Sequence, residues 1–470
     1  MKKESKVARS GETEKKVTIC VEGIEAVSPE DAEKVAKILD GLGQDIVGCC
    51  VDKGPAVIRL ALQMRLGVRY SRITKMANQI LRDLRIHPAR IEIPIPGHDA
   101  VGIEIPRSDP IEVECSEFIG KAWYGQYQET AKRAMSLPVA FGKDVCGNFV
   151  VEDLATMPHM LVSGAPGQGA PQFLHSVICG LIATRMPEQV QFIIADPRCV
   201  EFTPYSKLPH LVVPVINDMR KIVFSLNWAV AEMEKRLKMF AMARVRNIAD
   251  FNSRNRGAFE SDMFGDSYPL ADLPATLPYI VIIISDFDDV MEKVGMEVLP
   301  DIQRLAAKAR AAGIHLILET ERPDKKVFPG TLTANIPVRV AFKSASVKDS
   351  RMVLDDEGAE SLIGQGDALV RGREGMVRRV QAPSISDDEI ARIVADSVMS
   401  SKTRPLGDGH SLSKPQMAEI DMKVRMSFDE LKALRRHAEE SHRDVDDVVS
   451  EIVRERLDIL KESFAEDPFK

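Results

Sequence analysis

The sequence lacks the features that would place it in a membrane or outside the cell. No apolar run approaches the roughly 18 residues that a membrane-spanning helix needs. The charged first sixteen residues contain no apolar segment, so they are expected to form a disordered tail and not a signal peptide. These absences favour a cytoplasmic protein without a membrane segment.

Regular cysteine spacing is also missing. The seven cysteines form no CxxC pair with partner histidines, which argues against a structural zinc site and against a disulfide framework. Reduced, structural thiols are the simpler explanation. No metal ligand is therefore assigned.

The chain has no excess of positive charge. It carries 63 basic and 70 acidic residues, a formal net charge of -7, so it does not attract a phosphate backbone as a whole. Any contact with nucleic acid must come from a local basic surface. Its 44% apolar and 28% charged residues are typical of globular proteins, and 470 residues exceed one ordinary core. Several domains are expected.

The periodicity of apolar residues divides the chain into successive segments. An α+β domain is expected after the tail, because short strand-like stretches alternate with helices such as Pro29 to Leu42. An α/β domain with a doubly wound parallel sheet is expected next, because buried runs such as VQFIIAD and YIVIIISD alternate with long amphipathic helices such as Glu297 to Ala312. A linker rich in Ser, Gly, Pro and Lys precedes a small final domain. The expected boundaries are 1–16, 17–137, 138–400, 401–418 and 419–465.

A glycine-rich turn joins a buried strand to a helix in HMLVSGAPGQGAPQFLHS. This is the layout of a phosphate-binding loop, GxxxxGK[ST], in which the lysine reaches the β and γ phosphates and the hydroxyl holds magnesium. Ala170 and Pro171 stand at those two positions, and Pro166 removes a further backbone N–H. Taken alone, the segment is better explained as an ordinary strand-to-helix turn. The residues of this degenerate loop are Gly164, Gly167, Gly169, Ala170 and Pro171.

Longer segments around the turn carry a stronger signal. They include GPAVIRL, PGHDAVGIEIP, GKDVCGNFVVEDLATMPHMLVSG, ADPRCVEF, WAVAEMEKR, LPYIVIIISDFDDVM, ANIPVRVAF and DSRMVLDDEGAESLIGQGD. Between Gly54 and Val380 the chain thus resembles the alpha and beta motor domains of the FtsK/SpoIIIE DNA translocases. The resemblance implies a RecA-like P-loop NTPase fold, a hexameric ring and double-stranded DNA threaded through its centre.

The resemblance also assigns candidate catalytic residues. In family motors, the strand that corresponds to LPYIVIIIS ends in an aspartate that holds magnesium and a glutamate that orients water. In this sequence, Ser285 and Asp286 occupy these two positions. Glu321 replaces the glutamine that senses the γ phosphate, and Glu319 adds a second acid. Two arginines resemble those that reach a neighbouring subunit's nucleotide, although surface salt bridges would explain them equally well. The candidates are Asp286, Glu321, Arg339 and Arg351.

These replacements all weaken the binding of phosphate and magnesium, whereas the apolar strand positions still resemble the family. They predict a pseudo-ATPase with no assured cofactor. ATP and Mg²⁺ are expected only if the degenerate site still binds them, for instance because a displaced basic residue such as Lys143 restores the missing charge.

The final segment differs from the family. IDMKVRMS alternates strictly, and two short amphipathic helices follow it, the first opened by a capping box of Ser427 and Glu430. This order resembles a ribbon-helix-helix domain, in which Lys423 and Arg425 would contact bases of double-stranded DNA. Acidic residues at the start of the second helix argue against a phosphate contact there. A dimerisation module remains the alternative.

Three functions stay open at this point. The first is a non-catalytic ring or scaffold component of a DNA translocation apparatus, the second an active ATP-dependent double-stranded DNA translocase, and the third a sequence-specific DNA-binding regulator. The partners expected are double-stranded DNA and further subunits, either copies of this chain or an active FtsK-like motor.

Overall fold

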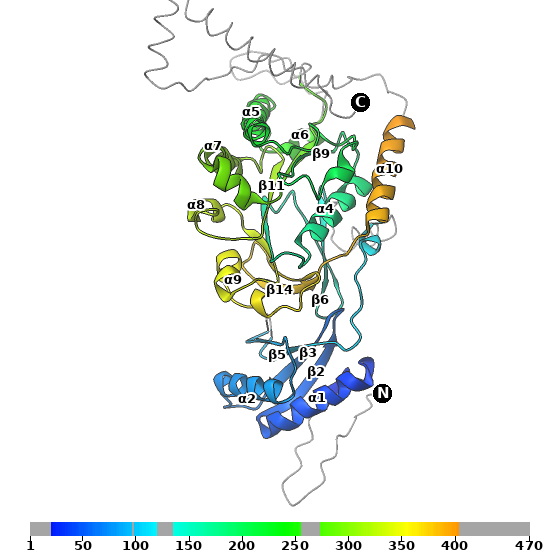
Figure 1. Ribbon diagram of the computed structural model, residues 1–470, viewed down its shortest axis with the longest axis vertical. Helices are drawn as coiled ribbons and strands as arrows, with labels where there is room; N and C mark the ends of the chain where they lie inside the picture. Colours follow the sequence, from blue (N-terminus) through cyan, green and yellow to red (C-terminus); the bar gives the residue numbers. More distant parts are fainter. Residues whose placement is uncertain (1–19, 96–97, 120–134, 255–272, 404–470) are drawn as a thin grey trace, which may run out of the picture. The chain divides into compact units, whose positions relative to one another are not determined.

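The computed structural model describes residues 20–95, 98–119, 135–254 and 273–403 (Figure 1). The chain divides into two compact units, residues 1–404 and 405–470, and all described residues belong to the first. The predicted ribbon-helix-helix segment, with Lys423 and Arg425, lies outside the described residues. Within the described ranges, no helix is both long and apolar enough to span a bilayer.

A five-stranded sheet backed by two helices forms the first part of the described chain. The strand order is β1-β2-β3-β5-β4, with β1 parallel to β2 and the other pairs antiparallel. The predicted helix Pro29–Leu42 is confirmed as α1, which starts where the Ser28 hydroxyl accepts the Asp31 N–H. The remaining elements are β1 (Cys20–Glu22), β2 (Ile46–Lys53), β3 (Val57–Met64), α2 (Tyr70–Asp83), β4 (Arg90–Glu92) and β5 (Val101–Pro106).

A nine-stranded sheet forms the centre of the second part. Its order is β7-β6-β14-β13-β12-β8-β11-β10-β9, in which the five strands from β12 to β9 are parallel. The prediction of a doubly wound parallel sheet is confirmed for these five, but two hairpins add four antiparallel strands, so the sheet is mixed. The strands are β6 (Pro138–Asp144), β7 (Phe149–Asp153), β8 (His159–Ser163), β9 (Val190–Ala195), β10 (Tyr279–Ile284), β11 (Ile314–Thr320), β12 (Val338–Phe342), β13 (Asp367–Arg371) and β14 (Val377–Gln381).

Helices cover both faces of this sheet (Figure 1). Along β10, Ile282 belongs to one apolar core and its neighbour Ile283 to the other, because successive side chains of a strand point to opposite faces. One face carries α4 (Ala170–Thr184) and α10 (Asp387–Thr403); the other carries α5 (Met219–Met242), α7 (Phe287–Lys308), α8 (Gly330–Thr333) and α9 (Val347–Leu354). The helix α6 (Ile248–Ser253) packs in a smaller apolar cluster.

Short 3-10 helices connect several of these elements. They are η1 (Ile24–Ala26), η2 (Gly43–Asp45), η3 (Cys115–Phe118), η4 (Thr203–Tyr205) and η6 (Ala359–Ser361). One predicted helix differs from the structure: residues 297–312 were expected, whereas α7 begins ten residues earlier and ends at Lys308. Its backbone is kinked at Val294, so two helical segments meet there and the predicted helix corresponds to the second.

A buried ion-pair network joins the two sheets. Arg379 on β14 lies 2.7 Å from Glu104 on β5 and 2.6 Å from Asp367 on β13, and all three side chains are at most 3% exposed. Arg90 on β4 adds a second cation 3.4 Å from Glu104. Nearby carboxylates raise the pKa of Arg379 despite its burial. The charges of this network are therefore balanced inside the protein.

Candidate nucleotide site

The carboxyl ends of the parallel strands meet at one edge of the large sheet. Ser163 at the end of β8 pairs with Thr320 at the end of β11, and Ile284 at the end of β10 pairs with Ala195 at the end of β9. The segments that follow these strands are therefore neighbours. This edge is where open α/β sheets bind their ligands, so it is the candidate site.

The glycine-rich turn keeps the backbone shape of a loop between strand and helix. Gly169 has φ +114, and a Cβ atom there would lie only 2.9 Å from the Gly366 nitrogen. Both observations require glycine at this position. The next residue, Ala170, begins α4, so the loop is followed directly by a helix N-terminus.

Hydrogen bonds within the chain use part of the loop's donor capacity. The Ala165 N–H donates to the Lys343 carbonyl at 2.9 Å, and the Gln168 N–H donates to the Ala165 carbonyl at 3.2 Å. Pro166 and Pro171 have no N–H. The N–H groups of 167, 169 and 170 have no hydrogen-bond partner within the part of the chain that the structure describes. The loop thus offers fewer donors than its length suggests.

The positions of the missing lysine and hydroxyl are occupied by apolar side chains. Ala170 is 3% exposed and belongs to the apolar core beneath α4, and Pro171 follows it in the first turn of the helix. The displaced lysine suggested by the sequence, Lys143, lies 2.5 Å from Glu117 in an ion pair on β6. Another lysine adjoins the loop: Lys343 follows β12, and its Nζ donates to the Ile363 carbonyl at 3.4 Å.

Ser285 and Asp286 follow β10 and are both buried. The Ser285 hydroxyl donates to the Ala195 carbonyl at 3.1 Å, so it is engaged with the backbone. Asp286 has φ +47, which is uncommon for a residue with a side chain, and its N–H donates to Glu319 Oε2 at 3.0 Å. Glu319 therefore helps to hold Asp286 in this conformation.

Arg198 connects the acidic side chains of the site. Its guanidinium lies 2.9 Å from the Asp286 carboxylate and 3.5 Å from the Glu321 carboxylate. It follows β9, while its partners follow β10 and β11. Two of the four candidate catalytic residues are therefore bound to a cation of their own chain.

Burial changes the protonation of the two inner acids. Burial raises the pKa of Asp286 to about 6, although the Arg198 guanidinium opposes the rise. Burial also raises the pKa of Glu319 to about 7, opposed by the Asp286 N–H and increased by the neighbouring carboxylates. The site therefore carries less negative charge near neutral pH than its count of acidic residues indicates.

These residues do not fit a magnesium ion bound with nucleotide. Pro171 supplies no oxygen, the Ser285 hydroxyl is used by the backbone, and the Asp286 carboxylate is paired with Arg198. No group of three or more His, Cys, Asp or Glu side chains is arranged to hold a metal ion within the described ranges.

The two arginines expected at a subunit interface differ in their surroundings. Arg339 is buried and donates to the carbonyls of Thr333 and Val353, both at 3.0 Å, and to Asp355 at 2.7 Å. Arg351 lies on α9 with its side chain 64% exposed and pairs with Glu357. Only Arg351 presents its guanidinium at the surface.

Sequence reasoning assigned no role to Arg198 or Lys343. Arg198 lies within the quoted segment ADPRCVEF, three residues after the end of β9. Its contacts are with residues 286 and 321, far away in the chain, so spacing along the sequence could not reveal them. The sequence offers one indication of a role for Arg198, which is its position just after a buried strand.

The fold and the loop define the class of protein. Five parallel strands between helices, with a glycine-rich turn after β8 and acidic residues after β10, form the P-loop NTPase fold. A solved structure of the pCW3 conjugation coupling protein TcpA, in monomer form with ATPγS, superimposes with a TM-score of 0.53 at 20% identity and covers 78% of this chain and 99% of that one. This likeness supports the fold.

The family follows from the sequence comparisons. Residues 24–107 match the FtsK alpha domain, and residues 125–325 match the FtsK/SpoIIIE family. DNA translocase FtsK of Pseudomonas aeruginosa is 38% identical over 380 residues, and that of Clostridium acetobutylicum is 40% identical over 364 residues. The chain belongs to the FtsK/SpoIIIE family. The alignments cover 78% and 77% of this chain but only 46% and 45% of those relatives.

Proposed function

We propose that this chain is a DNA-associated member of the FtsK/SpoIIIE family that hydrolyses no ATP and serves as a ring or scaffold component of a DNA translocation apparatus. The relatives named DNA translocase support the association with DNA. Loss of hydrolysis is supported above all by one observation. Ala170 and Pro171 begin α4 at the positions from which a lysine and a hydroxyl would reach phosphate and magnesium.

The missing lysine has a large effect on its own. A unit charge about 4 Å from a phosphate contributes roughly 4 kcal/mol at an effective dielectric constant of about 20. This free energy corresponds to about three powers of ten in affinity or rate. A P-loop site without that charge is expected to bind nucleotide weakly.

The ion pairs of Arg198 also oppose hydrolysis. A residue that orients the attacking water must offer a free carboxylate oxygen to it. Asp286 and Glu321 instead have the Arg198 guanidinium 2.9 and 3.5 Å away. The guanidinium thus competes with a water molecule for these carboxylates.

A second candidate function is an active ATP-dependent DNA translocase with altered site chemistry. Two observations favour it: the turn from 164 to 169 retains N–H groups without partners among the described residues, and Lys343 adjoins it. The third, a sequence-specific DNA-binding regulator, depends on Lys423 and Arg425 outside the described residues. For that segment, Lys423→Ala with Arg425→Ala should weaken binding to duplex DNA without unfolding the chain.

Phosphate release by the purified chain, with linear duplex and saturating MgATP, tests the proposal. An active family motor assayed in parallel is the positive control. We expect no DNA-stimulated release. Turnover of about 1 per second or faster that disappears in Asp286→Asn would show that the site is catalytic and the pseudo-ATPase proposal wrong. Duplex binding, measured separately by fluorescence anisotropy, tests the association with DNA.

A further inference from the structure

The exposed residues in and beside α2 carry an excess of positive charge. Residues 65–85 contain six basic residues and one acidic residue, whereas the whole chain has 63 basic and 70 acidic residues. The basic residues are Arg65, Arg69, Arg72, Lys75, Arg82 and Arg85, and all six are exposed. The charge of this segment is opposite to that of the protein as a whole.

The helix separates its apolar and basic residues onto opposite sides. Ile73, Ala77 and Leu81 are buried in the core of the first sheet. Arg72, Lys75, Gln79 and Arg82 follow one another at intervals of three and four residues, so they form one stripe on the other side. At a rise of about 1.5 Å per residue, the stripe is about 15 Å long.

Most of these cations have no carboxylate partner. Arg72 lies 3.1 Å from Asp45, but the other five basic residues of 65–85 form no ion pair with the residues that the structure describes. Several of them are three residues apart, as Arg72 and Lys75 are, and like charges at this spacing repel one another. Apart from Arg72, the cations of the stripe therefore gain no stabilisation from a neighbouring carboxylate.

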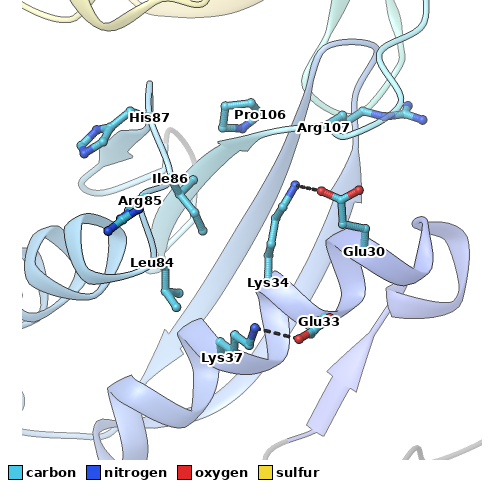
Figure 2. Close-up of a pocket in the computed structure, with 10 residues that line it drawn as sticks. All are labelled: Glu30, Glu33, Lys34, Lys37, Leu84, Arg85, Ile86, His87, Pro106 and Arg107. Atoms are coloured by element: carbon cyan, nitrogen blue, oxygen red, sulfur yellow. Dashed lines mark ion pairs between the residues drawn. The ribbon is translucent and has the colours of Figure 1, made fainter.

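The neighbouring helix α1 provides a contrast. A groove of about 350 Å³ lies between α1 and the segment that follows α2. On its α1 side, Lys34 pairs with Glu30 and Lys37 pairs with Glu33, at 3.0 and 2.7 Å (Figure 2). Helix α1 has two basic and four acidic residues, whereas α2 has three basic residues and one acidic residue, so the excess positive charge belongs to α2.

We propose that the exposed face of α2 binds the phosphate backbone of duplex nucleic acid without sequence preference. Duplex DNA carries one negative charge per about 1.7 Å of its axis, so a stripe about 15 Å long faces about nine phosphate charges. Guanidinium and ammonium groups are the side chains that bind phosphate oxygens in such contacts. The inference rests on the proposed association with DNA and locates it on a described surface outside the nucleotide site.

The test compares two double variants of the full chain that lose the same charge. Lys75→Gln with Arg82→Gln removes two unpaired cations of the stripe, and glutamine preserves the helix. Lys37→Gln with Lys293→Gln removes two exposed lysines that are each paired with a carboxylate. Binding to two duplexes of unrelated sequence is measured across a salt titration. Each lost phosphate contact reduces the slope of log K against log salt by about 0.9, so the stripe variant should lose about 1.8 and the control almost nothing.

Three results would overturn the inference. The first is an equal slope for both variants, the second is loss of subunit assembly by the stripe variant in sizing, and the third is a loss of binding to phosphatidylserine vesicles but not to duplex. Equal slopes would mean that α2 binds no nucleic acid. Loss of assembly would place α2 in a protein interface, and loss of vesicle binding alone would make it a lipid-binding surface. If the unmodified chain binds no duplex at all, the proposed association with DNA fails too. If the unmodified chain binds duplex but the two variants have equal slopes, only the role of α2 fails. The proposed association with DNA and the expected absence of phosphate release are then unaffected.

Discussion

Arg198 and Asp286 form an ion pair of 2.9 Å between two segments that follow neighbouring strands, β9 and β10. The same guanidinium reaches Glu321 after β11. The cation of the site is thus supplied from β9 and directed to the acids, whereas a phosphate-binding lysine would come from the loop after β8. The acidic residues of the site are therefore paired with a cation of the same chain, without any bound phosphate.

The buried Glu319 should make the fold less stable at alkaline pH. Its pKa rises from 4.5 to about 7 in the folded state, so the folded protein keeps a proton that the unfolded chain releases. The stability contributed by this group is present below pH 4.5 and is lost as the pH rises to about 7. Glu319→Gln should therefore raise the free energy of unfolding by about 1 to 3 kcal/mol at pH 8, with little change near pH 4.

Urea unfolding at both pH values provides the measurement. Glu297→Gln, the same change at an exposed position on α7, is the matched control. If Glu319→Gln destabilises the protein equally at both pH values, the prediction is wrong. The carboxylate would then stabilise the fold through its hydrogen bond to the Asp286 N–H.

The parallel strands could be predicted from the sequence because they are buried on both faces. Runs such as the one at Tyr279–Ile284 are continuously apolar, and this pattern is typical of a central parallel strand. The antiparallel strands gave a weaker signal. The strand Val377–Gln381, for example, includes Arg379, whose burial depends on Glu104 from the other sheet. A buried charge that is balanced by a distant residue cannot be distinguished in the sequence from an exposed one.

The network around Arg379 should be important for the stability of the described unit. Arg379→Met leaves Glu104 and Asp367 buried, and Asp367 loses its only ion-pair partner among the described residues. An uncompensated buried charge costs about 3 to 5 kcal/mol. Arg304→Met, which breaks an exposed pair with Glu234, should change stability by less than about 1 kcal/mol. Equal losses in urea unfolding would show that the buried network has no special role.

The candidate site was predictable only where the family pattern marks a position. Ala170, Pro171 and Ser285 could be assigned because each stands at a fixed place next to a recognisable strand. The contacts of Arg198 could not, because they join segments that only the strand order brings together. The same applies to Arg339: its segment suggested an interface, whereas its four hydrogen bonds lie within the chain.

Restoring the loop chemistry should restore binding more readily than hydrolysis. Ala170→Lys with Pro171→Thr returns the cation and the hydroxyl to the start of α4. ATP affinity in the presence of magnesium should rise by up to about three powers of ten in calorimetry. Hydrolysis should stay absent because Arg198 still holds Asp286. Ala170→Val with Pro171→Ala is the control, since it alters the same buried position without adding charge. No gain in affinity over this control would show that the loop itself no longer accepts phosphate.

This chain is expected to act on a partner motor through Arg351. If it assembles with an active FtsK-like motor, Arg351 is the arginine that could act on the neighbour's nucleotide, because Arg339 is buried and fully bonded. An arginine supplied from a neighbouring subunit can accelerate phosphoryl transfer by roughly 10³ to 10⁵. Arg351→Ala should therefore lower the turnover of mixed rings, whereas Lys348→Ala, an exposed change on the same helix, should not.

The mixing experiment distinguishes a role at the interface from a role in folding. Arg339→Ala removes several buried hydrogen bonds, so it should lower the free energy of unfolding of this chain and reduce turnover only as far as it reduces assembly. Arg351→Ala removes one exposed ion pair, so stability and assembly should be unchanged while turnover falls. Total ring concentration is held constant, and sizing confirms that both variants enter the ring. If turnover is the same with Arg351→Ala as with Lys348→Ala, the arginine serves no neighbour, and its pairing with Glu357 is an ordinary surface salt bridge.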